Sequence, residues 1–237
     1  MFKTWIKIWP EFQVETAAQR RRFVFRTFIT LACFVLIAVA QWVPLVCYPD
    51  VLSVVQRHES TFVVTFLMSM FLLSVYLISD QVRYTYCLSW VLVLVVVECE
   101  IVSLLLLEVE TNVLYLMLGL LVSLLVMVFG VGLGFLLPHD LTKSMNFMFT
   151  VSFSTLVVSV YVAVFLGILR LTWPFFVYAG IIVLMLLPVV VYHTQYTLGV
   201  GEMRMSLQDD KLAALLLFTD FLALFMLTLY LRPNRSY

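Results

Sequence analysis

The chain of 237 residues is 64% hydrophobic and only 12% charged, and its formal net charge is +0. This composition excludes a soluble globular domain and indicates an integral membrane protein. Its one basic cluster precedes the first apolar segment, so membrane lipid is the expected partner of these charges and nucleic acid is not.

Seven apolar segments of about 20 residues follow one another, each long enough to cross a hydrocarbon core of roughly 30 Å as a helix. The predicted spans are 23–48, 61–79, 87–107, 113–137, 147–169, 174–198 and 211–231. The apolar runs are continuous, which favours helices over the alternating strands of a membrane barrel. We therefore predict an all-α integral membrane fold, a seven-transmembrane-helix bundle. Its expected parts are a cytosolic N-terminal segment (1–22), the transmembrane domain (23–231) and a short C-terminal tail (232–237).

The distribution of positive charge predicts the orientation. Lysine and arginine are concentrated within residues 1–26, which favours a cytosolic N-terminus. With seven spans, the short loops that carry Arg83 and Lys143 lie on the same side. The two arginines of the C-terminal tail disagree, because they would then lie on the opposite side. A last segment that enters the membrane and returns, leaving both ends cytosolic, is the alternative.

Four ionisable residues lie within the predicted helices: Glu98, Glu100, His193 and Asp220. Each such group costs about 2.5–3.5 kcal/mol at the bilayer centre, so an ion or proton path is the functional expectation and structural hydrogen bonding is the alternative. Glu98 and Glu100 are separated by about 200° around a helix, so only one of them is expected to line a shared interior.

Asp220 lies near the middle of the last segment, too deep to reach an interface. It could pair with His193, bind a cation or remain protonated. His193 follows Pro188 by five residues, and this proline removes one backbone donor from the helix. A packed or interfacial histidine is the alternative to a functional one.

Glycine spacing points to helix packing. Gly130 and Gly134 stand in the stretch FGVGLG with the small-xxx-small spacing that permits close helix contact. Packing within the bundle is expected, and dimerisation is the alternative. The chain has no motif for nucleotide binding, zinc proteolysis or serine hydrolysis, so we expect no enzyme, no cofactor and no dedicated metal site.

The sixth and seventh segments resemble the transmembrane Bax-inhibitor-motif family, specifically its Lifeguard branch. That family reads Tyr-Asp-Thr-Gln, then a loop, then Ala-Ala-Leu-x-Leu-Tyr-x-Asp. Here YHTQ at 192–195 and AALLLFTD at 213–220 align with it without a gap in the loop. Weaker similarities are RRFVFRTF before the first span, HDLTKSM at 139–145 and the position of Glu100, whereas the region around 50–80 matches poorly.

The resemblance implies six helices around a central C-terminal helix, in an endoplasmic reticulum or Golgi membrane. It also implies a leak of calcium from stores and suppression of apoptosis. In that family, acids of the sixth and seventh helices form a pH-responsive pair that closes the pore. His193 and Asp220 occupy these positions, and Glu100 is expected as a further polar wall residue. Because an imidazole gains a positive charge below about pH 6.5, acidification would create an ion pair at the gate and repel calcium.

His193 stands where the family has an aspartate, and this difference leaves three outcomes open. The pore could conduct with an altered pH response, or a histidine–aspartate contact could keep it closed. The fold could also have been kept for binding membrane proteins. Such divergence is expected of a viral copy of a host gene, as in a cytomegalovirus. The predicted function is a calcium leak that suppresses apoptosis. The alternative is a viral adaptor that retains or redirects host membrane proteins in immune evasion, without ion conduction. A proton-coupled transporter is less favoured, because the chain shows no inverted repeat.

Overall fold

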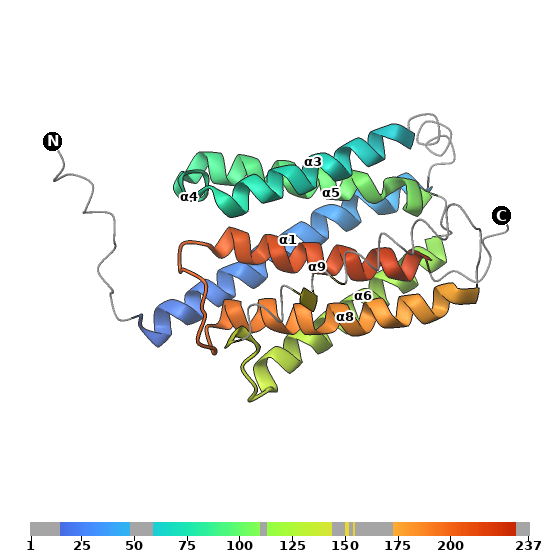
Figure 1. The fold of residues 1–237 in the computed structure, drawn as a ribbon. Coiled ribbons are helices and arrows are strands. Elements are labelled where there is room, and N and C mark those ends of the chain that lie inside the picture. Colours follow the sequence, from blue (N-terminus) through green and yellow to red (C-terminus); the bar gives the residue numbers. More distant parts are fainter. Residues whose placement is uncertain are drawn as a thin grey trace.

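A computed structural model describes residues 15–47, 59–109, 113–143, 150–151, 154 and 173–230. Within these residues the regular elements are helices, and none is a strand. Two are short: α4 (Asp80–Tyr84) and a 3-10 helix (Leu141–Lys143). The long helices, drawn in Figure 1, are α1 (Ala17–Cys47), α3 (Glu59–Ile78), α5 (Tyr86–Val109), α6 (Val113–Leu136), α8 (Trp173–Leu198) and α9 (Asp210–Tyr230).

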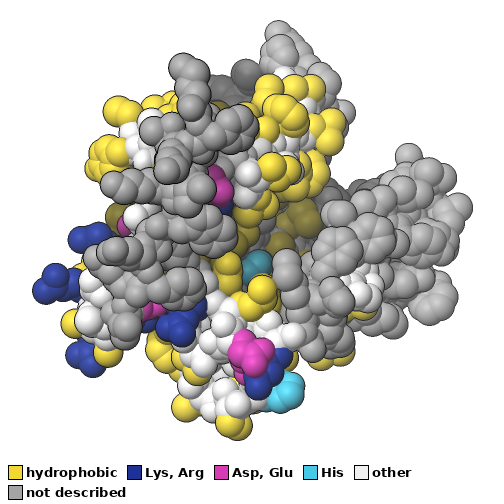
Figure 2. Space-filling model, turned by 60° about the vertical axis from the view of Figure 1, so that its left-hand side comes forward, with side chains coloured by type: hydrophobic (Ala, Val, Ile, Leu, Met, Phe, Trp, Pro, Cys, Tyr) yellow, Lys and Arg dark blue, Asp and Glu magenta, His cyan; other side chains and the backbone are white. Residues whose placement is uncertain are grey.

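Four of the described helices, α1, α5, α6 and α9, are long and apolar enough to cross a membrane. Large apolar side chains are exposed along α3, α5 and α6, and hydrophobic side chains cover much of the described surface in Figure 2. The chain is therefore a multi-pass integral membrane protein. The predicted fifth span, 147–169, lies outside the described residues apart from 150, 151 and 154, as does the tail, 232–237. The number of spans stays a prediction.

Helix α9 lies at the centre of the described bundle, packed against α1, α5, α6 and α8 (Figure 1). Its residues are apolar around most of its circumference, so burial on all sides is the stable arrangement. Phe218, Phe221 and Phe225 stack along α9, and Trp42 of α1 stacks on Phe225 with the ring centres 4.8 Å apart. Helix α3 lies outside, against α5.

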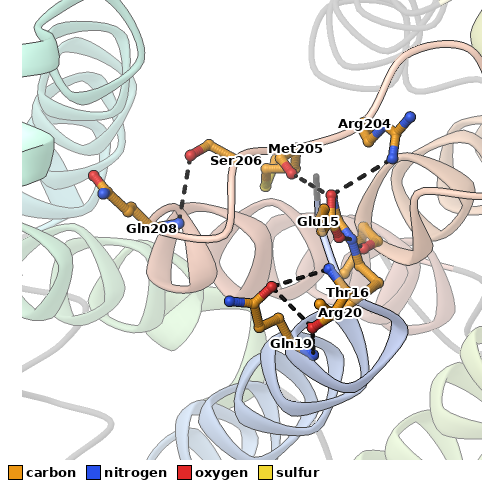
Figure 3. Close-up of polar contacts among 9 residues, drawn as sticks. Glu15, Thr16, Gln19, Arg20, Arg204, Met205, Ser206 and Gln208 are labelled. Atoms are coloured by element: carbon orange, nitrogen blue, oxygen red, sulfur yellow. Dashed lines mark hydrogen bonds and ion pairs between the residues drawn. The ribbon is translucent and has the colours of Figure 1, made fainter. Parts of the chain in front are cut away.

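Helix α1 begins at Ala17, six residues before the predicted start of the first span at residue 23. Thr16 and Gln19 form a reciprocal capping box, which provides partners for two of the backbone N–H groups left free at a helix start. The Thr16 hydroxyl accepts from the Gln19 N–H at 3.3 Å, and the Gln19 side-chain oxygen accepts from the Thr16 N–H at 3.0 Å (Figure 3). The helix thus begins before the predicted span, because residues 17–22 are already helical, and the boundary between the N-terminal segment and the transmembrane domain stays a prediction.

The basic residues that the structure describes gather at one end of the bundle, hereafter the basic end. Here α1 and α9 begin, α6 ends and α4 joins α3 to α5 (Figure 1), and Figure 2 shows several of these side chains together. The residues are Arg20, Arg21, Arg22, Arg26, Arg83, Lys143, Arg204 and Lys211.

Candidate functional site

A direct contact joins His193 of α8 to Asp220 of α9. The histidine Nδ1 lies 2.6 Å from the aspartate Oδ2, within hydrogen-bond distance. The Asp220 side chain is 8% exposed and that of His193 is 19% exposed, so both are largely removed from solvent. The sequence left three possibilities for Asp220: a pair with His193, a bound cation or a protonated acid. The structure contains the pair with His193.

His193 lies near the end of α8 at the basic end, whereas Asp220 lies at the middle of α9. Helix α8 continues through Pro188 and ends at Leu198, about 8 Å along its axis beyond His193. Asp220 lies about 15 Å from the start of α9 at Asp210.

Glu100 of α5 is buried against α9, with only 3% of its surface exposed. Its Oε1 lies 3.0 Å from the hydroxyl of Thr219, and that hydroxyl also lies 3.0 Å from the Leu215 carbonyl. The single hydroxyl proton cannot serve both oxygens fully. Among the described residues, Glu100 Oε2 has no hydrogen-bond partner. The Thr219 hydroxyl, which donates to Glu100 Oε1, thus ties the buried carboxyl group of α5 to α9.

The three predicted site residues, Glu100, His193 and Asp220, thus come together at α9. Thr219 contacts Glu100 on α5, and Asp220 contacts His193 on α8. Glu98, by contrast, is exposed on the outer surface of α5. The structure therefore selects Glu100 as the interior member of the two neighbouring glutamates, a choice that the spacing alone left open.

The chemistry of this site is a change of one charge in an apolar interior. With His193 neutral and Asp220 ionised, the contact carries one negative charge that can attract a cation. When the imidazole gains a proton, the contact becomes a neutral ion pair. Within the described part of the chain, no three histidine, cysteine or acidic side chains come together as metal ligands.

Gly130 and Gly134 lie where α6 crosses α8. A Cβ at Gly130 would come within 2.8 Å of Val190 Cγ1, and one at Gly134 within 2.6 Å of Thr194 Cγ2. Both distances are shorter than an ordinary carbon–carbon contact of about 3.5–4.0 Å. The two glycines therefore hold α8 close to α6 beside His193, within the bundle.

Two polar residues near the site, Gln195 and Asp140, bind the loop after α6 to α8 and to the loop after α8, respectively, and the sequence gives only a weak signal for them. The Gln195 side chain accepts from the Leu141 N–H at 3.0 Å and donates to the His139 carbonyl at 2.9 Å. Asp140 accepts from the Thr142 hydroxyl at 2.6 Å and from the Glu202 N–H at 2.8 Å, and the Thr142 bond holds the pKa of this carboxyl below its usual value. The available clue in the sequence was a glutamine directly after His193 and Thr194, within a predicted span.

Arg20 connects the start of α1 to the end of α8. Its guanidinium donates to the carbonyls of Thr197 at 3.3 Å and Met205 at 2.9 Å and pairs with Glu15, which also lies 3.6 Å from Arg204 (Figure 3). Within the run of arginines at 20–22, no sequence signal distinguishes Arg20. Only tertiary structure places it at the C-terminal end of α8, where a cation is favourable.

No family model, curated protein or solved structure matches the chain. The similarity to the Bax-inhibitor-motif family therefore stays a prediction, based on residues 192–195 and 213–220.

Proposed function

We propose that the chain controls a calcium leak from intracellular stores through the contact between His193 and Asp220, and thereby suppresses apoptosis. The observation that carries this proposal is the 2.6 Å contact inside a bundle of apolar helices. Ionisable groups in such surroundings are costly and commonly mark ion or proton paths. In this proposal calcium is the transported species and membrane lipid is the surrounding partner.

The proposed gate opens as the imidazole loses its proton. At acidic pH, protonated His193 and ionised Asp220 form a neutral pair, and the positive imidazolium repels calcium. At alkaline pH, neutral His193 leaves the negative charge of Asp220 available to a cation. Buried Glu100, bonded to Thr219, contributes a polar wall next to this gate.

We further propose seven spans around a central α9, with the basic end in the cytosol and the protein in endoplasmic reticulum or Golgi membranes, those of a host cell if the chain is viral. The length of α9 supports a complete final span. Its continuous helix, Asp210–Tyr230, extends for about 31 Å, which matches the hydrocarbon thickness. A segment that enters and returns would need a break near its middle.

The test is calcium efflux from dye-loaded proteoliposomes between about pH 5.5 and 8, a range that brackets histidine titration. The native protein is expected to leak more as pH rises. Asp220→Asn removes the anionic site and should lower the leak at alkaline pH, and His193→Asp should move the midpoint of the pH dependence, because two carboxyl groups then titrate. Asp210→Asn, the same change at the start of the same helix, is the matched control and should behave as native.

Two results would reject the proposal. If the native protein is silent and His193→Asp conducts, the contact is a permanent closure, and binding of other membrane proteins becomes the leading function. If Asp220→Asn leaks with the native pH profile, the contact is structural and calcium takes another route. In cells, the same variants should change store calcium in the order that they show in liposomes.

A further inference from the structure

Glu98 of α5 and Gln41 of α1 form a polar pair on the outer surface of the bundle. Gln41 Nε2 lies 3.0 Å from Glu98 Oε1 and 2.9 Å from Oε2, and Glu98 is exposed. Along its helix, Glu98 is about 18 Å from Tyr86 and about 16 Å from Val109. The carboxyl group therefore lies within the apolar region of α5, too far from either end for a short side chain to reach an interface.

The contacts of Glu98 differ from those of the interior acid. Both of its oxygens lie near the NH2 group of one amide. A carboxylate has about four acceptor positions, and the single amide NH2 group leaves part of this capacity unused. Among the described residues, no cation lies within ion-pair distance of Glu98, whereas Asp220 has His193. The leak mechanism proposed above makes no use of this pair.

The surroundings of Glu98 have the pattern of a helix-binding face. Val91, Leu94 and Val95 are 58%, 42% and 41% exposed, and with Glu98 they form an i, i+3, i+4, i+7 series along one side of α5. A neighbouring helix that lay along this apolar stripe would meet the carboxylate at a defined depth. Ordinary lipid tails offer it no hydrogen-bond donor.

We propose that the Glu98–Gln41 pair is a docking site for the transmembrane helix of another membrane protein that carries one arginine or lysine within its span. Charge complementarity selects this occupant. A basic side chain would neutralise the carboxylate and supply the hydrogen-bond donors that it lacks. The carboxylate would in turn give the basic group a partner within the membrane, where an unpaired charge is costly. The apolar stripe sets the register, and the ionic contact selects the partner. This site is separate from the proposed calcium gate, because Glu98 contacts Gln41 whereas His193 contacts Asp220.

The test uses the full chain in lipid nanodiscs and two synthetic leucine-rich helices of about 20 residues, one with a central arginine and one with leucine there. Fluorescence transfer between labelled protein and peptide measures binding. The arginine peptide is expected to bind about 3- to 30-fold more tightly than the leucine peptide, the range that intramembrane hydrogen bonds provide. Glu98→Gln should remove this preference, and Glu98→Asp should retain it.

Glu202→Gln, the same change in an exposed loop, is the matched control and should keep the preference. Equal binding of the two peptides, or a preference that survives in Glu98→Gln, would overturn the proposal. Self-association of the native chain that is lost in Glu98→Gln would identify a second copy as the occupant and would also overturn it. A crosslinker placed at position 98 that captures only a second copy of this chain, and no other membrane protein, would also overturn the proposal. None of these outcomes depends on calcium efflux.

Discussion

The close approach of α6 to α8 can be tested with one methyl group at Gly134. An added Cβ there would lie 2.6 Å from Thr194 Cγ2 and 2.7 Å from Thr194 Cβ. Thr194 is fully buried, and its hydroxyl donates to the Val190 carbonyl at 2.8 Å, so the side chain has little room to move. Relief requires the helices to separate by about 1 Å, since carbon atoms normally approach to about 3.5–4.0 Å.

Gly132 provides the matched control, because a Cβ there has no neighbour within 4 Å. Replacing either glycine by alanine brings the same gain in helix propensity, about 0.5–1 kcal/mol. This gain cancels in the comparison of the two variants. The remaining difference is the cost of overpacking, about 1–3 kcal/mol, so Gly134→Ala should unfold more easily than Gly132→Ala by that amount.

The assay is equilibrium unfolding of both variants in mixed detergent micelles, monitored by circular dichroism. Equal free energies of unfolding for the two variants, or a more stable Gly134→Ala, would show that α6 and α8 are not in close contact at this level. Because Thr194 follows His193 directly in sequence, Gly134→Ala should also alter the pH profile of calcium efflux, whereas Gly132→Ala should leave it as in the native chain.

Three further predictions concern the core and the basic end. Trp42→Ala removes a fully buried ring that stacks on α9, and should lower the free energy of unfolding by about 3–5 kcal/mol in the same assay. Thr219→Ala removes the partner of the buried Glu100 carboxyl and should cost about 1–3 kcal/mol, most of which Thr219→Ser should recover. The hydrogen bond from Arg20 lowers the pKa of Glu15 below 4.5, so its stabilisation is complete above that pH and disappears as the pH falls through the lowered value. Unfolding measured from about pH 6 to 3 should show this loss in the native chain, and a shallower one in Glu15→Gln.

Helix boundaries illustrate how far local signals reach. The predicted segments at 61–79, 87–107, 113–137, 174–198 and 211–231 agree with α3, α5, α6, α8 and α9 to within two residues at each end. Hydropathy succeeds here because a helix in lipid must satisfy its own backbone and present apolar side chains along its length. Helix α1 begins six residues before its predicted span, because a capping box and not hydropathy sets the start of that helix.

The candidate site shows where sequence reasoning stops. Glu98 and Glu100 have the same chemistry, and their spacing indicates only that they point in different directions. Both are flanked by apolar residues on every side of the helix, so no periodicity marks the buried face. The sequence did not indicate Thr219 for a similar reason. Its hydroxyl could have bonded only to a carbonyl of its own helix, and the contact with Glu100 is visible only in the structure.

The sequence by itself determined the membrane class, the helical elements and the set of costly ionisable residues, since each of these follows from local composition and backbone hydrogen bonding. Tertiary structure decided which of those residues meet. It places α9 between α5 and α8, so that Glu100 reaches Thr219 and His193 reaches Asp220, while Glu98 stays on the surface beside Gln41. In a chain that is apolar on nearly every face, the choice of partners depends on which helices lie side by side, and helix packing over the whole bundle sets this.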